Sequence, residues 1–274
     1  MISLQIARFT LKEAVRKRFF LMAAIVGVVF LALYAVGFHF INEEWLRNGM
    51  SQNKSGLYST QLVMAGLFLI HLLGILVAIA VSVSSVSQEV EEGTIQLVAT
   101  KPLGRWEIVA GKWLGLAALL AIYVLGMAWG ILAVGYAIAG YWPPQPYLPS
   151  LLMLLAALLF MSLSLLLGSF LSTLPNALLL LTLFGIAFFG GMVEGIGAII
   201  RSDTMVNIGI GTSLLAPSDA LWRLASHLLD PSQPLTAGPF SSFTEPSSWM
   251  VLYSAVYAGA ALLGATRVIA KRDL

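Results

Sequence analysis

Residues 148–170 read LPSLLMLLAALLFMSLSLLLGSF, a run of 23 residues without a charged side chain. About 20 mostly apolar residues in an α-helix cross the roughly 30 Å hydrocarbon core of a bilayer, and a helix pairs its own backbone groups there. Five further stretches of the 274-residue chain have a similar length and composition. The six predicted membrane spans are residues 19–40, 62–83, 113–139, 148–170, 176–197 and 249–269.

The overall composition agrees with a membrane protein. Charged residues make up 10% of the chain, whereas soluble domains contain about 25%. The net charge of +2 is too small to indicate a nucleic-acid partner, and the absence of cysteine excludes disulfides and thiolate metal sites. We therefore expect an all-α polytopic protein in a lipid bilayer, with no nucleic-acid partner.

The distribution of Lys and Arg predicts the orientation. Eleven of the 15 basic residues fall in the N-terminal segment, between spans two and three, or in the C-terminal tail, and four fall on the other side. Cytoplasmic loops carry the excess of Lys and Arg. The prediction is a multi-pass protein of the cell (inner, cytoplasmic) membrane with both termini in the cytoplasm.

The most charged stretch lies between spans two and three, where residues 87–113 read SQEVEEGTIQLVATKPLGRWEIVAGKW. Ile95, Leu97 and Val98 interrupt its polar run, which indicates a short amphipathic element that fits a groove on a partner protein. The alternative is a solvated loop whose charges only fix the topology. The order of the residues favours the first interpretation.

That order resembles the first cytoplasmic loop of ABC-2 type permeases, the membrane subunits of a class of ATP-binding-cassette transporters. The pattern E…E-x-G-T…P-x-x-R…G-K is carried by Glu89, Glu92, Gly93, Thr94, Pro102, Arg105, Gly111 and Lys112. The basic N-terminus, the six spans, the long segment between spans five and six and the short basic tail also resemble that family. Its members include the permeases that serve copper-site maturation of nitrous oxide reductase.

The resemblance implies a division of the chain into parts. Residues 1–18 would form an elbow helix along the inner leaflet, and residues 19–274 a six-span domain. Within that domain, residues 87–112 would be the coupling loop and residues 201–248 an outer helical segment. The residues expected to dock on the ATPase are Glu89, Glu91, Glu92, Gly93 and Thr94, with Pro102, Arg105, Gly111 and Lys112 completing the motif.

The resemblance also implies partners. Two ATPase subunits would bind ATP and Mg²⁺ and power transport. The expected direction is outward, because the resemblance implies an exporter-like family. The complex would contain two permease subunits. The second would be either another copy of this chain, which gives a homodimer, or a different permease. An extracytoplasmic partner protein, as in metal-site maturation, is the alternative to small-molecule transport.

The chain has no ATP-binding motif of its own. The nearest candidate, residues 104–112, reads G-x6-G-K followed by Trp113, which has the wrong spacing for a phosphate-binding loop and lacks the Ser or Thr for magnesium. Three histidines and no carboxylate-rich cluster give no reason to expect a metal site. We therefore expect a non-catalytic subunit without a cofactor, whose ATPase is a separate polypeptide.

Two ionisable residues lie within predicted spans and are candidates for a substrate path. Glu194 would line that path or bind a cation. Alternatively, Gly190, Gly191, Gly195 and Gly197 would break the helix and leave Glu194 in water at the outer end. His71 would face a polar path, or would make an interhelical hydrogen bond.

Three further hypotheses concern the outer segment and the function class. Ser218 could cap an amphipathic helix over residues 216–229 that lies on the outer interface or dips into it. An intramembrane hydrolase would use Ser213 with His227, although the G-x-S fragment is short. A channel or passive scaffold would need no ATPase at all.

Overall fold

The structure, a computed structural model, describes residues 6–11, 18–47, 52–91, 105–230 and 246–271. Those residues form helices joined by short turns, and none of them lies in a strand. The helices are α2 (Arg18–Arg47), α3 (Gln52–Glu91), α5 (Arg105–Ala139), α6 (Tyr147–Gly168), α7 (Thr173–Ile200), α8 (Asp203–Leu215), α9 (Ser218–Leu229) and α11 (Trp249–Lys271).

Six of these helices are long and apolar enough to cross a membrane, which confirms the predicted all-α architecture with six spans. Each candidate span overlaps one predicted stretch, and the ends differ by at most four residues except at Arg47, which lies seven residues beyond the predicted end of the first span. The candidate spans are Phe20–Arg47, Tyr58–Val83, Val109–Ala139, Tyr147–Gly168, Thr173–Ile200 and Trp249–Val268.

Helix α6 lies at the centre of the bundle. It packs against α3, α5, α7, α9 and α11, and 14 of its 22 residues are buried. Trp113 Nε1 of α5 donates a hydrogen bond to Ser162 Oγ of α6 (2.9 Å), and Asn176 Nδ2 of α7 donates to the Ser164 carbonyl (3.0 Å). These polar links fix α5 and α7 against α6 where the surroundings are otherwise apolar.

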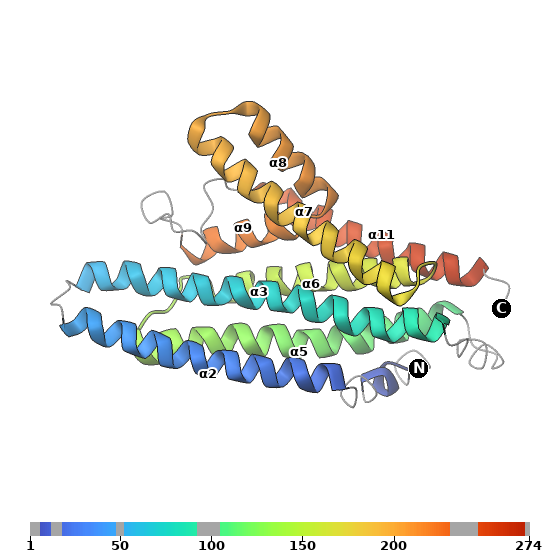
Figure 1. Cartoon of the computed structure of the whole chain (residues 1–274), viewed down its shortest axis with the longest axis horizontal. Helices are drawn as coiled ribbons and strands as arrows, with labels where there is room; N and C mark the ends of the chain where they lie inside the picture. The colour runs from blue at the N-terminus through green and yellow to red at the C-terminus, as the bar shows by residue number, and fades with distance from the viewer. Residues whose placement is uncertain (1–5, 12–17, 48–51, 92–104, 231–245, 272–274) are drawn as a thin grey trace.

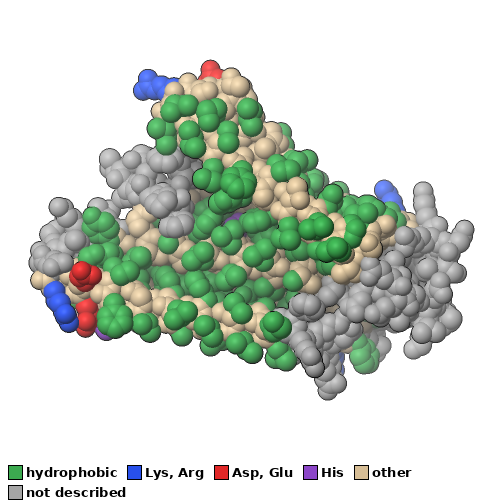
Figure 2. Space-filling model, in the orientation of Figure 1, with side chains coloured by type: hydrophobic (Ala, Val, Ile, Leu, Met, Phe, Trp, Pro, Cys, Tyr) green, Lys and Arg blue, Asp and Glu red, His purple; other side chains and the backbone are tan. Residues whose placement is uncertain are grey.

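Helices α2, α3, α5 and α6 run along the long axis of the molecule, and α7 is inclined across them (Figure 1). The start of α2, the end of α3, the start of α5 and the end of α11 lie at the same end of the bundle in that view. Hydrophobic side chains cover most of the visible face. The described charged side chains lie toward the two ends of the bundle and at the tip of the α7–α8 hairpin (Figure 2). This distribution is expected of a protein whose sides face lipid and whose ends lie in water.

Helices α3 and α5 are longer than a bilayer requires. The 40 residues of α3 extend about 60 Å at 1.5 Å per residue, twice the hydrocarbon thickness. The helix continues from the end of its candidate span at Val83 to Glu91, and α5 begins at Arg105, ahead of its own span at Val109. Much of the predicted 87–112 loop is therefore helical.

Helices α7 and α8 form a tight antiparallel hairpin that projects from the bundle (Figure 1). Arg201, the C-cap of α7, takes the left-handed conformation (φ 56°), and the Ser202 N–H donates to the Gly197 carbonyl (2.8 Å). A Cβ on Gly197 would lie 2.7 Å from Met205 Cβ, so only glycine permits this approach. Helix α7 is continuous through all four glycines around Glu194, so the predicted helix break there is wrong.

Helix α9 confirms the predicted helix in the 201–248 segment, but its surroundings differ from the prediction. Nine of its 12 residues are buried, because it packs among α3, α6, α7, α8 and α11 rather than at a lipid interface. Pro217 is its N-cap, and Ser218 is the first helical residue, without a side-chain cap bond. The stripe of Leu221, Leu224 and Ala225 does face the core, but Arg223 and Ser226 on the polar side are buried too.

The elbow segment falls mostly outside the described residues. Within the segment 1–18, residues 6–11 are helical, and Thr10 is buried against α5. A Cβ on Gly115 would lie 2.7 Å from the Ala7 carbonyl oxygen, so this short helix rests on a glycine face of α5. An elbow along the inner leaflet stays a prediction.

Candidate functional site

The predicted coupling residues divide between two helix ends. Glu89 and Glu91 belong to the last turn of α3, and Arg105 is the first residue of α5. Gly111 and Lys112 lie two turns into α5. The remaining members of the motif fall outside the described residues; they are Glu92, Gly93, Thr94 and Pro102.

One contact joins these two helix ends. Lys112 Nζ of α5 donates a hydrogen bond to the Ser85 carbonyl of α3 (3.4 Å), and Gly111 beside it is buried. The lysine therefore links α5 to a carbonyl of α3 that lies six residues before that helix ends at Glu91. The docking role of the motif stays a prediction.

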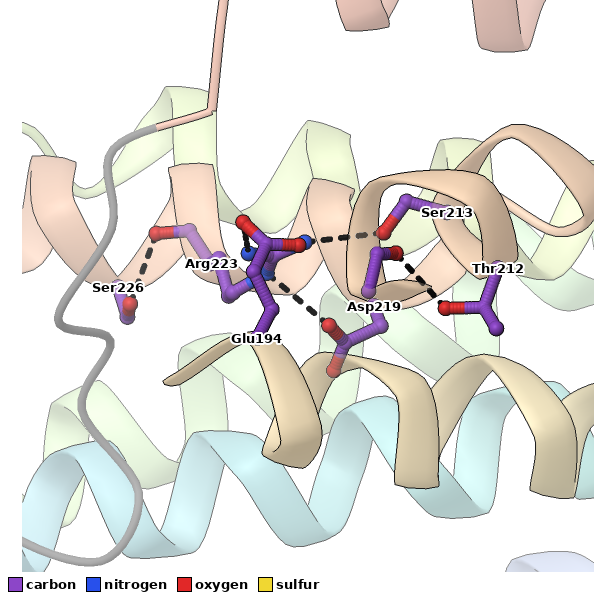
Figure 3. Close-up of polar contacts among 7 residues, drawn as sticks. Glu194, Thr212, Ser213, Asp219, Arg223 and Ser226 are labelled. Carbon is purple, nitrogen blue, oxygen red and sulfur yellow. Dashed lines mark hydrogen bonds and ion pairs between the residues drawn. The ribbon is translucent and has the colours of Figure 1, made fainter. Parts of the chain in front are cut away.

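The second predicted candidate, Glu194, lies in a buried charge cluster. Its side chain on α7 is 8% exposed and forms an ion pair with Arg223 Nη1 of α9, whose side chain is 7% exposed. Arg223 Nε also lies 3.0 Å from Asp219 Oδ2, one turn earlier on α9. Figure 3 shows the guanidinium between the two carboxylates.

Serine side chains complete the surroundings of Arg223. Its Nη2 donates a hydrogen bond to Ser213 Oγ of α8 (3.0 Å), and Ser226 Oγ donates to the Arg223 carbonyl (2.8 Å). The guanidinium thus contacts groups from α7, α8 and α9 (Figure 3). Arginine suits this position because its planar fork presents five donors in fixed directions.

Glycines allow the cluster to form. A Cβ on Gly191 would overlap the Asp219 carboxylate, and a Cβ on Gly190 would overlap Thr212. On α8, Gly209 lies against Glu194 Cβ, and a Cβ there would also lie 2.8 Å from the Gly190 carbonyl oxygen. The small residues of α7 and α8 therefore bring Glu194 and Asp219 within reach of one arginine.

Among the described residues, the cluster places two carboxylates, Glu194 and Asp219, around the Arg223 guanidinium. Burial raises the pKa of Asp219 to about 6; the Arg223 charge opposes that increase, and the Glu194 charge adds to it. A buried charge is costly, so burial favours the protonated form of Asp219.

His71 of α3, the other predicted path residue, is buried next to this cluster. The ring packs against Trp222 of α9, with ring centroids 5.6 Å apart, and within the described part of the chain the His71 Nδ1 atom has no hydrogen-bond partner. His71 and Asp219 line the same small pocket. The role of Glu194 and His71 in a substrate path stays a prediction.

The geometry does not support a hydrolase at Ser213. Its Oγ accepts the hydrogen bond from Arg223, and His227 Nε2 has no hydrogen-bond partner among the described residues. A serine nucleophile needs a base within hydrogen-bonding reach.

Sequence reasoning missed Asp219, Arg223 and Ser213 as members of one cluster. In the sequence, Arg223 contributed only to the count of Lys and Arg residues that predicts the orientation. The available signal was the Asp219–Arg223 pair at four-residue spacing on a predicted amphipathic helix, which indicates an ion pair but not its partner on α7.

Comparison with known families adds an independent finding. A sequence model described as ABC-2 family transporter protein matches residues 4–269, which is nearly the whole chain. A comparison with curated proteins finds no significant match. The match agrees with the six apolar helices and with the motif between the second and third spans. The chain belongs to the ABC-2 family of transporter proteins, as a multi-pass permease subunit of an ABC transporter.

Proposed function

We propose that this chain is the permease of an ATP-driven exporter, and that a separate ATPase subunit moves it through the acidic end of α3 and the start of α5. The family supports a permease subunit with an ATPase partner. The docking surface, the direction of transport and the composition of the complex are the additional elements of this proposal.

The observation that carries the proposal is the length of α3 and α5. Both continue as helices beyond their candidate spans toward the acidic segment. A helix is stiff over this distance because each turn is hydrogen-bonded to the next. A displacement at Glu91 would therefore reach the bundle core, where α3 packs against α6, α7 and α9.

The contact between Lys112 and the Ser85 carbonyl supports movement of the two helix ends as a pair. A partner that grips the 92–104 segment would pull on both helices together. The proposed orientation places these ends in the cytoplasm of the cell membrane, with both termini, because most Lys and Arg residues belong to that side. Two copies of the permease with two ATPases would form the complex.

The test is a pair of charge reversals. Replacing Glu91 and Glu92 by Lys (E91K/E92K) should abolish co-purification with the partner ATPase, or lower permease-stimulated ATP hydrolysis at least tenfold. Membrane insertion should be unchanged, since Glu91 lies eight residues beyond Val83, where the candidate span ends.

A matched control exists at the other end of the bundle. Glu43 and Glu44 are adjacent acidic residues near the end of α2, and the ion pairs of Glu43 with His39 and Arg47 are exposed. The same reversal there (E43K/E44K) should leave association and hydrolysis unchanged, because exposed pairs contribute little. Normal association and hydrolysis in E91K/E92K would overturn the docking proposal.

A further inference from the structure

We propose that helix α8 (Asp203–Leu215) is embedded in the lipid bilayer, in the leaflet that surrounds the end of α7, and that acyl chains of this leaflet cover its exposed apolar side chains. The partner of this surface is therefore lipid. The proposal concerns the chain alone and does not depend on the ATPase.

Helix α8 begins at the edge of a candidate span. The span of α7 ends at Ile200, and the hairpin tip that follows it carries two exposed charged residues, Arg201 and Asp203. Charged residues at the end of a span lie at the level of the lipid headgroups or in water. From this tip α8 runs back antiparallel to α7 (Figure 1). It therefore points from the membrane surface toward the bilayer interior.

The exposed face of α8 changes from polar to apolar along the helix. Its first exposed side chains, up to Asn207, are polar, and no charged residue follows Asp203 in this helix. The exposed side chains beyond Asn207 are all apolar and between 44% and 53% exposed; they belong to Ile208, Ile210, Leu214 and Leu215. A helix that lies in water keeps polar residues along its whole exposed face. The observed order is expected of a helix that leaves the headgroup region and enters hydrocarbon.

The last carbonyl groups of α8 have partners within the protein. Tyr253 of α11 donates a hydrogen bond to the Leu214 carbonyl (2.6 Å), and Tyr257 donates to the Leu215 carbonyl (3.1 Å). Carbonyl groups in the last turn of a helix have no partner within that helix. Water supplies one at a wet surface, but hydrocarbon does not, and an unpaired carbonyl there is costly. The two hydroxyl groups therefore supply what α8 requires in order to end in lipid.

The positions of the tyrosines indicate the depth of this end. The candidate span of α11 begins at Trp249, whose exposed side chain is of the kind that anchors a span at the headgroups. Tyr253 and Tyr257 follow it by about 6 and 12 Å along the helix axis, at 1.5 Å per residue. The end of α8 therefore lies within one leaflet, whose hydrocarbon is about 15 Å thick.

The neighbours of α8 support lipid as the partner. Helix α8 packs along α7, and its end is hydrogen-bonded to α11. Both neighbours are candidate spans, and both expose large apolar side chains, among them Met192 and Ile196 of α7 and Leu252 and Val256 of α11. The exposed apolar residues of α8 therefore continue the surface of two spans. This continuity favours acyl chains over a protein partner.

This placement gives α8 two different faces. Its buried Ser213 accepts a hydrogen bond from Arg223, whereas its exposed face contacts acyl chains. The bilayer therefore touches the same helix that holds one side of the buried charge cluster.

The experiment measures the depth of single positions of α8 in the purified full chain in lipid nanodiscs. The chain has no cysteine, so each single substitution by cysteine carries the only nitroxide label. Oxygen concentrates in hydrocarbon and a nickel chelate stays in water, so the ratio of their collision rates with the label reports its depth. This ratio should increase at least about threefold from Thr204→Cys to Leu215→Cys, because only the second label lies in hydrocarbon.

Two glycines provide matched controls. Gly211 of α8 and Gly259 of α11 both have open space where a Cβ would lie, so a label at either position meets no neighbour. Gly259 belongs to a candidate span, and Gly259→Cys gives the reference for lipid. The ratio for Gly211→Cys should fall between those for Thr204→Cys and Gly259→Cys. This variant tests the proposal even if Leu215→Cys does not fold.

A ratio at Leu215 and Gly211 as low as that at Thr204 would place α8 in water and overturn the proposal. Low collision rates with both reagents at these two positions would show that protein, such as a second copy of the chain, covers this face, and would overturn it as well. None of these results bears on the docking of the ATPase.

Discussion

Arg223 of α9 forms a buried ion pair with Glu194 of α7, although 29 positions separate the two residues in the sequence. The pair fastens the helices between the fifth and sixth spans to the fifth span itself. A buried pair of this kind gains little net stability, but removal of one partner leaves an uncompensated charge. The effect of a substitution here therefore depends on which charge is lost.

The first prediction follows from that asymmetry. Arg223→Met leaves two buried carboxylates and should destabilise the chain by about 3–5 kcal/mol. Glu194→Gln leaves Arg223 with Asp219 as a neutral pair, and should cost only about 1 kcal/mol. The melting temperature in detergent micelles compares the two variants.

Arg201→Met, at the exposed tip of the α7–α8 hairpin, removes the same type of charge without burial and provides the control. Its melting temperature should stay close to that of the unsubstituted chain. Equal losses in Arg223→Met and Glu194→Gln would contradict the charge count given for this cluster.

The second prediction concerns the contact between α7 and α8. Gly209→Ala places a methyl group against Glu194 and 2.8 Å from the Gly190 carbonyl oxygen. Overpacking of this kind costs about 1–3 kcal/mol. The variant should melt at a lower temperature than the unsubstituted chain.

Gly211, two residues later on the same helix, has open space where its Cβ would lie. Gly211→Ala should therefore be neutral or stabilising by up to about 1 kcal/mol, because alanine is the better helix former. If both alanine variants melt alike, close packing of α8 on α7 is not what holds the hairpin.

The third prediction concerns the end of α8. Tyr253 and Tyr257 of α11 donate hydrogen bonds to the carbonyls of Leu214 (2.6 Å) and Leu215 (3.1 Å). These carbonyls belong to the last turn of α8, whose C=O groups have no partner within the helix. The Tyr253→Phe/Tyr257→Phe variant should lose about 1–3 kcal/mol, and hydrogen exchange at the end of α8 should become faster.

Tyr136→Phe is the matched control, since Tyr136 is exposed and packs its ring edge-on against Trp142. Unchanged hydrogen exchange in the double variant would show that α11 does not hold the end of α8 through these hydroxyl groups.

The fourth prediction is a pH dependence. Burial raises the pKa of Asp219 from 3.8 to about 6 in the folded chain. Between these values the folded state keeps its proton while the unfolded state has released it, so stability falls as the pH rises through this range. The melting temperature of the unsubstituted chain should therefore fall more steeply between about pH 4 and 6 than that of Asp219→Asn.

Subtracting the melting-temperature profile of Asp219→Asn from that of the unsubstituted chain removes the contribution of the other carboxyl groups. Asp203→Asn should give a pH profile parallel to that of the unsubstituted chain, because Asp203 is exposed. Parallel profiles for all three proteins would show that Asp219 titrates in its ordinary range.

The sequence predicted the spans well because hydropathy and length are properties of one segment at a time. The candidate span Val109–Ala139, for example, begins four residues before the predicted stretch at Trp113 and ends at the same residue. Helix α8 was predicted only as an undivided part of the outer helical segment 201–248, without bounds of its own. Its sequence, DTMVNIGIGTSLL, contains two glycines and no clear apolar stripe, so the helix depends on packing against α7.

The candidate site was predicted only in part. Glu194 and His71 stood out because ionisable residues are rare in apolar helices. Their surroundings depend on the tertiary fold: Arg223 reaches Glu194 because α9 turns into the bundle, and no spacing rule relates the two. The same buried polar face explains why α9 resembled an interfacial helix in sequence and yet lies inside the protein.

The continuity of α3 sets a rule for how its length can vary. Each residue turns a helix by about 100°, so one residue inserted between Val83 and Glu91 would rotate the acidic terminus by that angle relative to His71. A seven-residue insertion, almost two full turns, would restore the original direction and move the terminus about 10 Å along the axis. Insertions or deletions in this stretch would therefore preserve the direction of a docking surface only when their length is close to a whole number of helical turns.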